Sequence, residues 1–462
     1  MGDLGFSRSR VAGARVRRYN DRPFRKDGEY VLYWMQQSQR VEENHALAFA
    51  METAAYLEKP LVVAFCLFGA YPEARWPHFV FMLEGLRELA RRFEALRLPF
   101  VLRIGDPLTV LPPLVEKAGA LVLDVGYLRH QKEWREHFGQ KAGCAVMAVE
   151  SDVVTPVASA LDRRAYGAHV LRRSLGVRWR AFLEEPLLGP IPAFRGLPPG
   201  GEDPEEGENL LRRAGVPFSP MPPAWSFRGG EGAAGERLNV FITDKAALYA
   251  EARSLPHRQA VSCLSPYLHF GMIAPSLVVR RIEKASLIPS EAKAAFLEQL
   301  VVRRELAMNF VYYTKDYDCY GSLPTWALET LDAHRKDARA FVYSLSDLEN
   351  ARTHDPYWNA AMMEARRTGY MHNVMRMYWG KKVLEWSSSP EEAFERLIFL
   401  NNRYFLDGRD PCSYAGCGWI FGLHDRPWPS RPVFGSVRFM AASGLERKSR
   451  IGEYVSWVDS LV

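Results

Sequence analysis

The chain has 462 residues, of which 48% are apolar and 25% are charged. This length and apolar content exclude a chain that is disordered throughout, and they suffice for two domains with cores of their own. The formal net charge of +6 permits a polyanionic partner, but many enzymes without such a partner carry a similar charge, so charge alone excludes little.

Six cysteines are scattered along the chain, and the closest pair is Cys412 and Cys417. This pair lacks the two-residue spacing and the second ligand pair of a zinc site, so we expect free thiols in a reducing compartment and no metal. No apolar run reaches the eighteen or more residues of a membrane span, and no signal-peptide core follows the first arginines. These features predict a cytoplasmic protein.

In chain order, residues 1–28 are rich in arginine and show little apolar periodicity. They predict a flexible basic tail, with an arm that touches DNA as the alternative. Across residues 29–186, the apolar runs YVLYWM, PLVVAFCLF, PFVLRI and ALVLDVG alternate with helical patterns. This alternation predicts an α/β domain with a mostly parallel, Rossmann-like sheet covered on both faces. No G-x-G-x-x-G follows the first strand, so the common dinucleotide fingerprint is not supported.

Proline, glycine and acidic residues crowd together between residues 187 and 236, which predicts a linker between domains. From 237 to 462 the pattern becomes almost wholly helical, which predicts an all-α domain. Within it, Ser265 before Pro266 favours a helix N-cap whose free backbone N–H groups could meet a phosphate, and a capped helix without a ligand is the alternative.

The stretch from Thr353 to Trp386 reads as two amphipathic helices broken near Gly369. In the second helix, apolar residues recur at steps of four, four, four and three, which places them on one buried face: Met371, Met375, Trp379, Val383 and Trp386. Trp379 and Trp386 would then lie about 10 Å apart along the helix, close enough to relay an electron. An ordinary hydrophobic core is the alternative.

Four blocks, THDPYWNAA, TGYMH, RMYWGKKVLEW and LNNRYFLDGRDP, follow one another in this half of the chain. Together they resemble the C-terminal half of class II cyclobutane pyrimidine dimer (CPD) photolyases, within the photolyase/cryptochrome family. The resemblance covers residues 30–454 and implies an α/β antenna-type domain followed by a helical domain that binds flavin adenine dinucleotide (FAD). It also implies a monomer that acts on UV-damaged DNA, with a deazaflavin, a folate or no pigment in the antenna domain.

The resemblance carries residue roles onto matching positions. The FAD-binding positions are Tyr249, Arg253, Leu264, Ser265, Leu268, Asn359, Asn401, Asp407 and Asp410. Asn401 would lie near the reactive N5 edge of the flavin, Met377 near the substrate pocket, and Trp419, in a small-residue loop, would stack on the dimer. Trp358, Trp379 and Trp386 would form the electron relay from the surface.

One catalytic position departs from the family pattern. Gln299 stands where the family has a glutamate that hydrogen-bonds the damaged base and helps its radical anion to split. An amide keeps an acceptor oxygen and gains two donors, but it has no ionised carboxylate and cannot be protonated. Gln299, Arg303 and Leu306 are expected on one face of a helix that runs from Phe296 to Phe310.

The last segment is basic, and its cations are expected to contact DNA phosphates: Arg426, Arg431, Arg438, Arg447, Lys448 and Arg450. Ser443 and Glu446 depart here from the family motif that places an arginine in the bubble left by a flipped dimer. We therefore expect light-driven repair of CPDs in DNA by electron transfer from reduced FAD. A cryptochrome-like photoreceptor that keeps FAD and the tryptophan relay but repairs weakly or not at all is the alternative.

Overall fold

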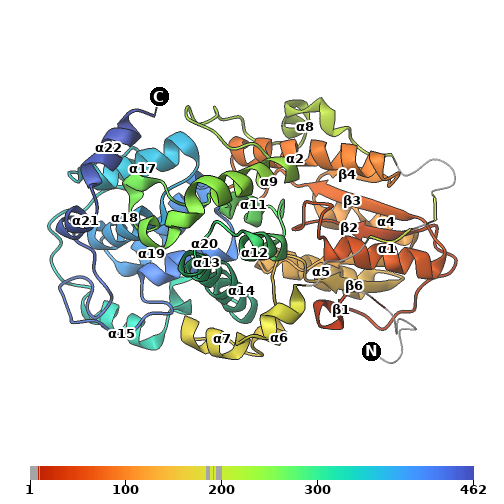
Figure 1. Ribbon diagram of the computed structural model, residues 1–462, viewed down its shortest axis with the longest axis horizontal. Helices are drawn as coiled ribbons and strands as arrows, with labels where there is room; N and C mark the ends of the chain where they lie inside the picture. Colours follow the sequence, from red (N-terminus) through yellow and green to blue (C-terminus); the bar gives the residue numbers. More distant parts are fainter. Residues whose placement is uncertain (1–8, 10, 184–187, 191, 194–199, 462) are drawn as a thin grey trace.

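The computed structural model describes residues 9, 11–183, 188–190, 192–193 and 200–461. An α/β region and a helical region lie side by side, with the sheet at the right of Figure 1 and the helices at its left. The order of these two regions along the chain is the predicted one. No described helix is both long enough and apolar enough to cross a bilayer.

The sheet has six described strands in the order β1-β6-β5-β2-β3-β4. All neighbouring strands pair in parallel except β1, which is antiparallel to β6. Their bounds are β1 Val16–Arg18, β2 Tyr30–Trp34, β3 Leu61–Leu67, β4 Phe100–Ile104, β5 Ala118–Asp124 and β6 Ala145–Val149. Every residue of β2, β5 and β6 is buried, as expected for central strands covered on both faces.

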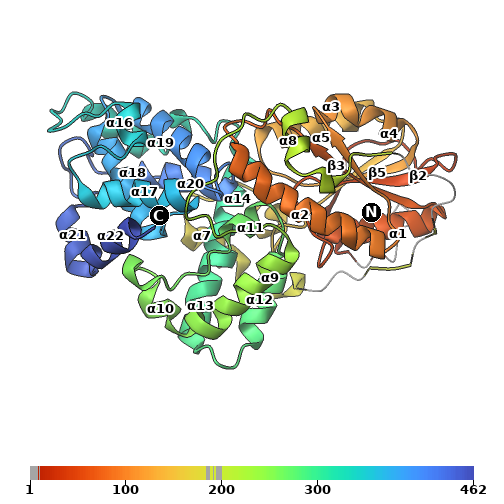
Figure 2. The same cartoon turned by 90° about the horizontal axis from the view of Figure 1, so that it is seen from above.

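Helices cover both faces of this sheet (Figure 2). On one face, α1 (His45–Leu57) and α2 (Trp76–Ala95) share a core with the odd-numbered residues of β2, such as Val31 and Tyr33. On the other face, α4 (Pro112–Glu116) and α5 (Arg129–Lys141) pack with even-numbered residues such as Leu32 and Trp34. The short helix α3 (Pro107–Val110) precedes α4. The two-residue period of a strand thus divides its side chains between two cores.

The prediction of a flexible tail over residues 1–28 is wrong for its second half, while residues 1–8 and 10 lie outside the described part. Arg15 is buried and donates hydrogen bonds to the carbonyls of Glu150, Val153 and Val154 at 2.6–3.1 Å. Directly after it, β1 pairs with β6, and Arg17 forms an ion pair with Glu150 at 2.9 Å. These arginines therefore bind the protein itself rather than a free polyanion.

The structure also differs from the predicted end of the α/β domain and the predicted start of the helical domain. After β6, α6 (Val157–Ala160) and α7 (Ala168–Leu175) pack into a core shared with the helical region, so the α/β unit ends near residue 150 rather than 186. Within the predicted linker, α8 (Glu208–Arg213) buries Leu210 and Leu211 in the core beside α2. The next helix, α9 (Glu231–Val240), begins before residue 237. Composition marked this segment as irregular but did not show that it packs.

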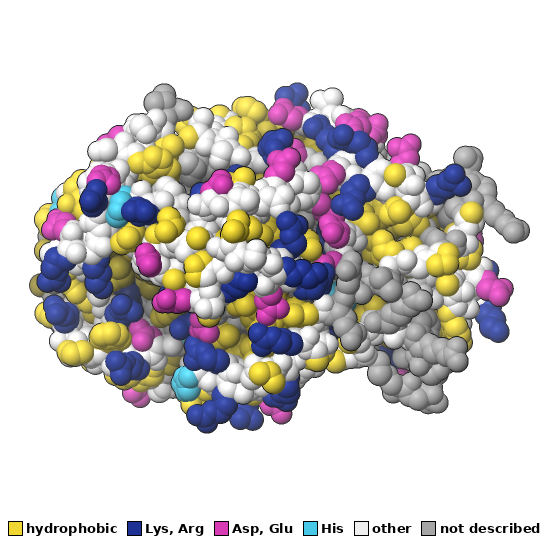
Figure 3. All heavy atoms as spheres, viewed as in Figure 1, with side chains coloured by type: hydrophobic (Ala, Val, Ile, Leu, Met, Phe, Trp, Pro, Cys, Tyr) yellow, Lys and Arg dark blue, Asp and Glu magenta, His cyan; other side chains and the backbone are white. Residues whose placement is uncertain are grey.

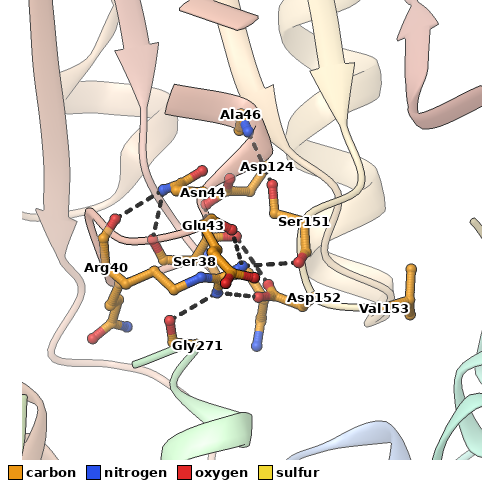
Figure 4. A network of polar contacts seen from close by, with 12 residues as sticks. Ser38, Arg40, Glu43, Asn44, Ala46, Asp124, Ser151, Asp152, Val153 and Gly271 are labelled. Atoms are coloured by element: carbon orange, nitrogen blue, oxygen red, sulfur yellow. Dashed lines mark hydrogen bonds and ion pairs between the residues drawn. The ribbon is translucent and has the colours of Figure 1, made fainter. Parts of the chain in front are cut away.

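A buried polar network joins the two regions at the carboxyl ends of β2, β5 and β6 (Figure 4). Arg40 forms an ion pair with Asp152 at 2.6 Å and donates to the carbonyl of Gly271 in the helical region at 2.9 Å. Asp124 accepts three backbone N–H groups from residues 36–38 at 2.8–3.0 Å. Gly271 has φ +66°, and a Cβ there would lie 1.8 Å from the carbonyl oxygen of Gln37, so only glycine permits this contact.

The largest core lies mostly in the helical region and continues into the face of the sheet that α4 and α5 cover. Its helices after α9 are α10 Tyr249–Ala252, α11 Ser265–His269, α12 Pro275–Lys284, α13 Ser290–Leu297, α14 Arg304–Tyr313, α15 Thr325–Ala333, α16 Leu345–Glu349, α17 Pro356–Thr368, α18 Asn373–Trp386, α19 Pro390–Tyr404, α20 Pro411–Ile420, α21 Ala442–Lys448 and α22 Ile451–Asp459. As predicted, α17 ends at Gly369, which has φ +76°. The interpretation of α18 as amphipathic is wrong, because nearly all of its sides are buried, including Lys381 and Lys382.

Candidate functional site

A cavity of about 390 Å³ opens inside the helical region, between α10, α11, α14, α18, α19 and α20. Most of the predicted site residues line it: Tyr249, Arg253, Leu264, Ser265, Leu268, Gln299, Met377, Trp379, Asn401, Asp407, Asp410 and Trp419. These positions range from residue 249 to residue 419 and come from five α-helices and the turns between them. The fold therefore gathers in one place the residues that the sequence resemblance had connected.

Gln299 lies in a π-helical turn, η7 (Glu298–Arg303), between α13 and α14. The Arg304 N–H donates to the carbonyl of Gln299, five residues back, so the backbone is one residue wider here than an α-helix. The expected continuous helix from Phe296 to Phe310 is interrupted at this turn. Gln299, Arg303 and Leu306, which were expected on one face of that helix, nevertheless all line the cavity. Single π turns of this kind often occur at functional sites.

Trp419 lies near the C-terminal end of α20, not in a loop as predicted. Close packing fixes this end of the helix: a Cβ at Gly380 of α18 would lie 2.7 Å from the Ile420 side chain. The buried Lys381 ammonium donates to the Ile420 carbonyl. Gly416, one turn before Trp419, lines the cavity, and a Cβ there would meet no atom within 4 Å. The space beside Gly416 is therefore open to a flat ligand.

Four arginines and two aspartates line the cavity: Arg253, Arg303, Arg304, Arg376, Asp407 and Asp410. Arg376 of α18 forms an ion pair with Asp407 at 2.9 Å. His269 of α11 contacts Asp410 at 3.3 Å; burial alone would raise the pKa of Asp410, but the hydrogen bond and charge of His269 lower it. Asp410 also caps α20 by accepting the Cys412 N–H at 2.7 Å. The lining is thus net positive, which suits a ligand that carries phosphates.

The same lining fits the FAD that the sequence resemblance implies. The cationic side chains match a diphosphate, and the open space at Gly416 matches a flat ring. In addition, the indole N–H of Trp379 is buried at the cavity wall and has no hydrogen-bond partner in the described part of the chain. An unpaired buried donor of this kind indicates that a ligand group completes the site.

The three predicted relay tryptophans form a chain of ring contacts, which we call the tryptophan stack, although only Trp358 and Trp379 are nearly parallel and Trp386 meets Trp358 edge to face. Trp358 of α17 lies between the other two, with ring centroids 6.4 Å from Trp379 and 5.7 Å from Trp386. The Trp358 indole donates to the backbone carbonyl of Trp379 at 2.9 Å, which fixes its orientation. A direct step along α18 from Trp379 to Trp386 is therefore not the shortest route, because Trp358 fills the gap. Trp386 is itself buried, and it contacts the rings of Tyr343 and His354.

Two predicted cofactor positions differ from expectation. Asn359 does not line the cavity; its amide is occupied by Thr353, donating to the Thr353 carbonyl at 2.8 Å and accepting from its hydroxyl at 2.8 Å. Ser265 lines the cavity but is the first residue of α11 rather than its N-cap, which is Leu264. Asn401, on α19, is buried at the wall and donates to the Asn402 amide oxygen at 3.2 Å.

The predicted DNA-contacting cations are exposed on the segment that follows α20. Within the described residues only Arg450, with Glu453, forms an ion pair, and the others have no acidic partner. Trp428, 37% exposed, contacts the guanidinium groups of Arg426 and Arg438, whose carbons are 5.5 and 5.1 Å from its ring centroid. Glu446, the departure from the family motif, accepts the Tyr357 hydroxyl at 2.8 Å. Lys and Arg side chains are frequent at the left edge of Figure 3, where Figure 1 places α21.

His269, Arg376 and His424 are among the cavity residues that the sequence reasoning missed. His424 follows α20, and burial lowers its pKa to about 4. His269 stands in the same block as Ser265 and Leu268 and could have been found there. Arg376 opens the block RMYWGKKVLEW and could have been found there too, whereas His424 lies outside the four blocks.

A second, smaller cavity of about 110 Å³ lies at the carboxyl ends of β2 and β3. Trp34, Phe68, Tyr71 and Trp134 supply aromatic walls. Both polar atoms of the Gln36 side chain are buried at this cavity without a partner in the described residues. Ligands of open parallel sheets commonly bind at this edge. Among the described residues, no group of three or more His, Cys, Asp or Glu side chains could hold a metal.

Comparison with known proteins places these features in context. The family model for DNA photolyase matches residues 31–190. The chain is 41% identical over 462 residues to the deoxyribodipyrimidine photo-lyase of Methanothermobacter thermautotrophicus, covering 98% of this chain and 99% of that protein. The enzyme of the same name from Oryza sativa subsp. japonica is 40% identical, over 94% of this chain and 88% of its own. That from Potorous tridactylus is 37% identical, over 92% and 80%.

Among solved structures, a bacterial class III photolyase from Agrobacterium tumefaciens superposes with a TM-score of 0.71. The match covers 93% of this chain and 86% of that one at 21% identity. This likeness concerns the fold alone, and it includes the α/β region, the helical region and their order.

Proposed function

The chain belongs to the DNA photolyase family of flavoprotein DNA-repair enzymes, and from this premise we propose that it is a class II enzyme that uses light to repair CPDs in DNA. The observation that carries the proposal is the cavity of the helical region. Gln299 and Trp419, the expected substrate residues, line the same cavity as the expected cofactor residues Arg253 and Asp407. Trp379 joins that cavity to the tryptophan stack.

In this proposal, different residues of the cavity bind the cofactor and the dimer. Arg253 and the Arg376–Asp407 pair hold and orient FAD, and the indole N–H of Trp379 donates to it. Bound FAD supplies the light-driven transfer of an electron to the dimer and its return after the ring has opened. Trp419 stacks on the extruded dimer, an interaction worth about 1 to 3 kcal/mol per base.

Gln299 serves the dimer differently from a glutamate. Its amide donates a hydrogen bond to a pyrimidine carbonyl, but it adds no negative charge and delivers no proton. The stack of Trp379, Trp358 and Trp386 offers a route for an electron from outside, which restores the reduced state of the cofactor. The unpaired cations after α20 bind the phosphates that flank the lesion.

The second cavity supports an antenna pigment. Its aromatic walls and the unpaired Gln36 amide suit a planar ring with polar edges. Its volume lies below the roughly 300 Å³ typical of sites that enclose a whole ligand, so we expect it to enclose only the ring of a deazaflavin or folate. The absorbance of the purified protein distinguishes these two pigments from FAD alone.

The proposed function is tested by reducing the flavin of the purified protein with light and a thiol donor. Loss of thymine dimers from an oligonucleotide is then followed by chromatography, in the light and in the dark. We expect light-dependent repair by the natural chain, and a higher yield per absorbed photon from a Gln299→Glu variant, because a carboxylic acid can share a proton with the dimer.

The matched control is Gln140→Glu, the same chemical change at an exposed position of α5. It should leave the repair yield unchanged. A natural chain whose flavin is reduced by light while the dimers stay intact would contradict the proposal and favour the photoreceptor alternative.

A further inference from the structure

We propose that Arg303 binds the phosphate that joins the two nucleotides of the dimer, and so acts as a substrate-binding residue that no sequence motif assigned. This inference rests on the proposed function. Arg303 ends the π-helical turn that carries Gln299, and its guanidinium lies over the Trp419 ring, 5.4 Å from the ring centroid. Both side chains line the cavity. The guanidinium therefore sits against the surface on which the dimer is expected to stack.

The Nε of the Arg303 guanidinium has a partner in the protein, whereas its two terminal nitrogens have none in the described residues. Its Nε donates to Glu298 Oε1 at 3.3 Å, and Arg172 of α7 holds the same carboxylate with bonds of 3.1 and 2.5 Å. The π-helical turn makes this possible, because it brings residues five apart, Glu298 and Arg303, onto one side. The terminal nitrogens of Arg303 have no hydrogen-bond partner in the described part of the chain. They form a fork that fits two phosphate oxygens.

The other cations of the cavity are already engaged. Arg304 is buried and donates to the Asp152 carbonyl at 2.6 Å, Arg376 is paired with Asp407, and Arg253 is assigned to the cofactor. His424 is close to Arg303, but burial lowers its pKa to about 4, so it is neutral at pH 7. Arg303 shares the Glu298 carboxylate with Arg172 and keeps its terminal nitrogens without a partner in the described residues, so it is the lining arginine left for the substrate.

The position of Arg303 favours the phosphate over the bases. Its side chain is 33% exposed, which places it where the cavity meets solvent. The bases of an extruded dimer go deeper, toward Gln299 and the cofactor residues, while the phosphodiester between them has to stay at the opening. At the opening, the flat face of the guanidinium can stack on an aromatic ring, while its N–H groups donate to this phosphate.

The test measures DNA binding in the dark, by fluorescence anisotropy, with two matched oligonucleotides that each hold one thymine dimer. In one, the phosphate within the dimer is replaced by a neutral methylphosphonate; in the other, a phosphate three nucleotides away is replaced. For the natural chain we expect the first change to weaken binding about tenfold or more relative to the second, since a hydrogen bond between charged groups is lost. An Arg303→Gln variant should bind both oligonucleotides equally.

Arg303→Lys keeps the charge but loses the fork, so it should show an intermediate ratio. Arg172→Gln is the control, because Arg172 holds the same carboxylate but does not line the cavity, and it should keep the full ratio. The inference is overturned if the natural chain gives equal affinities, or if Arg303→Gln and Arg303→Lys keep the natural ratio. If the natural chain binds an undamaged oligonucleotide of the same sequence as tightly as the dimer-containing one, the proposed function fails together with the inference.

Discussion

The junction between the two regions differs from the cavity of the helical region in whether its polar side chains have partners within the protein. At the junction, Arg15, Arg40 and Arg304 are buried, and each donates to carbonyls or a carboxylate of the protein. At the cavity, Trp379 and the ends of Arg303 have no partner in the described residues, and the basic segment after α20 is largely unpaired. Paired charge holds the two regions together, and unpaired charge indicates where a ligand binds.

We expect the largest effect on stability when a buried charge at the junction loses its partner. Asp152→Ala removes the carboxylate that faces Arg40 at 2.6 Å, and both side chains are almost fully buried. An unpaired buried charge costs about 3 to 5 kcal/mol, so we expect the free energy of unfolding to fall by that amount. Urea unfolding followed by circular dichroism measures it. Glu236→Ala, which breaks an exposed pair with Arg228, should change stability little, and equal losses would contradict the distinction.

The tryptophans behind the cavity should matter mainly for electron transfer. Trp358→Phe removes the ring between Trp379 and Trp386 while it keeps most of the buried apolar volume. We expect light-driven reduction of the flavin to be nearly lost, measured by absorbance under illumination with a thiol donor. Repair by flavin reduced chemically beforehand should persist. Trp76→Phe, a buried tryptophan of α2, is the control; an unchanged reduction rate in Trp358→Phe would exclude the stack as the route.

One junction carboxyl should make stability depend on pH. Burial raises the pKa of Glu305 to about 8, although the N–H groups of Val154 and Thr155 donate to it at 2.6 and 3.1 Å. Between pH 5 and 8 the unfolded chain is ionised at this position while the folded chain keeps its proton. Stability should therefore fall as pH rises, by up to about 1.4 kcal/mol per pH unit.

A Glu305→Gln variant sharpens this point, because the amide keeps an acceptor oxygen and does not titrate. Urea unfolding at pH 5, 6, 7 and 8 should show a smaller decrease with pH than in the natural chain. Glu236→Gln, at an exposed position, should keep the natural pH dependence. If Glu305→Gln keeps it as well, the carboxyl does not hold a proton in the folded chain.

The smallest expected effects concern the exposed cations. Arg431→Ala and Arg447→Ala each remove one side chain that has no acidic partner. If each contacts one phosphate, the slope of log affinity against log salt concentration should become shallower by about 0.9. Anisotropy titrations at 50 to 200 mM salt measure the slope, and stability should not change. Arg228→Ala, an exposed arginine paired with Glu236, should leave the slope unchanged; a similar change there would show that the effect is not local.

Local patterns in the sequence were sufficient to predict most of the strands and the helical character of the second half. The runs that became β2, β3, β4 and β5, the helical character of the second half and the break at Gly369 follow from periodicity and from one glycine with positive φ. The strand β6 was missed although it is as long as β2 and β4, and the three-residue β1 lies in the arginine-rich segment that was interpreted as a tail. The family resemblance, which covers residues 30–454, then connected predicted site residues from 249 to 419, and most of these line one cavity.

Tertiary structure decided what those residues can do. The sequence alone identified Trp358, Trp379, Trp386, Gln299 and Trp419, but periodicity describes a single helix and contains no information about its neighbours. Packing of α17 against α18 placed Trp358 between two tryptophans of the next helix, and the π-helical turn aimed Arg303 at Trp419. Burial, which depends on every neighbour in space, decided which charges are paired at the junction and which are left for a ligand.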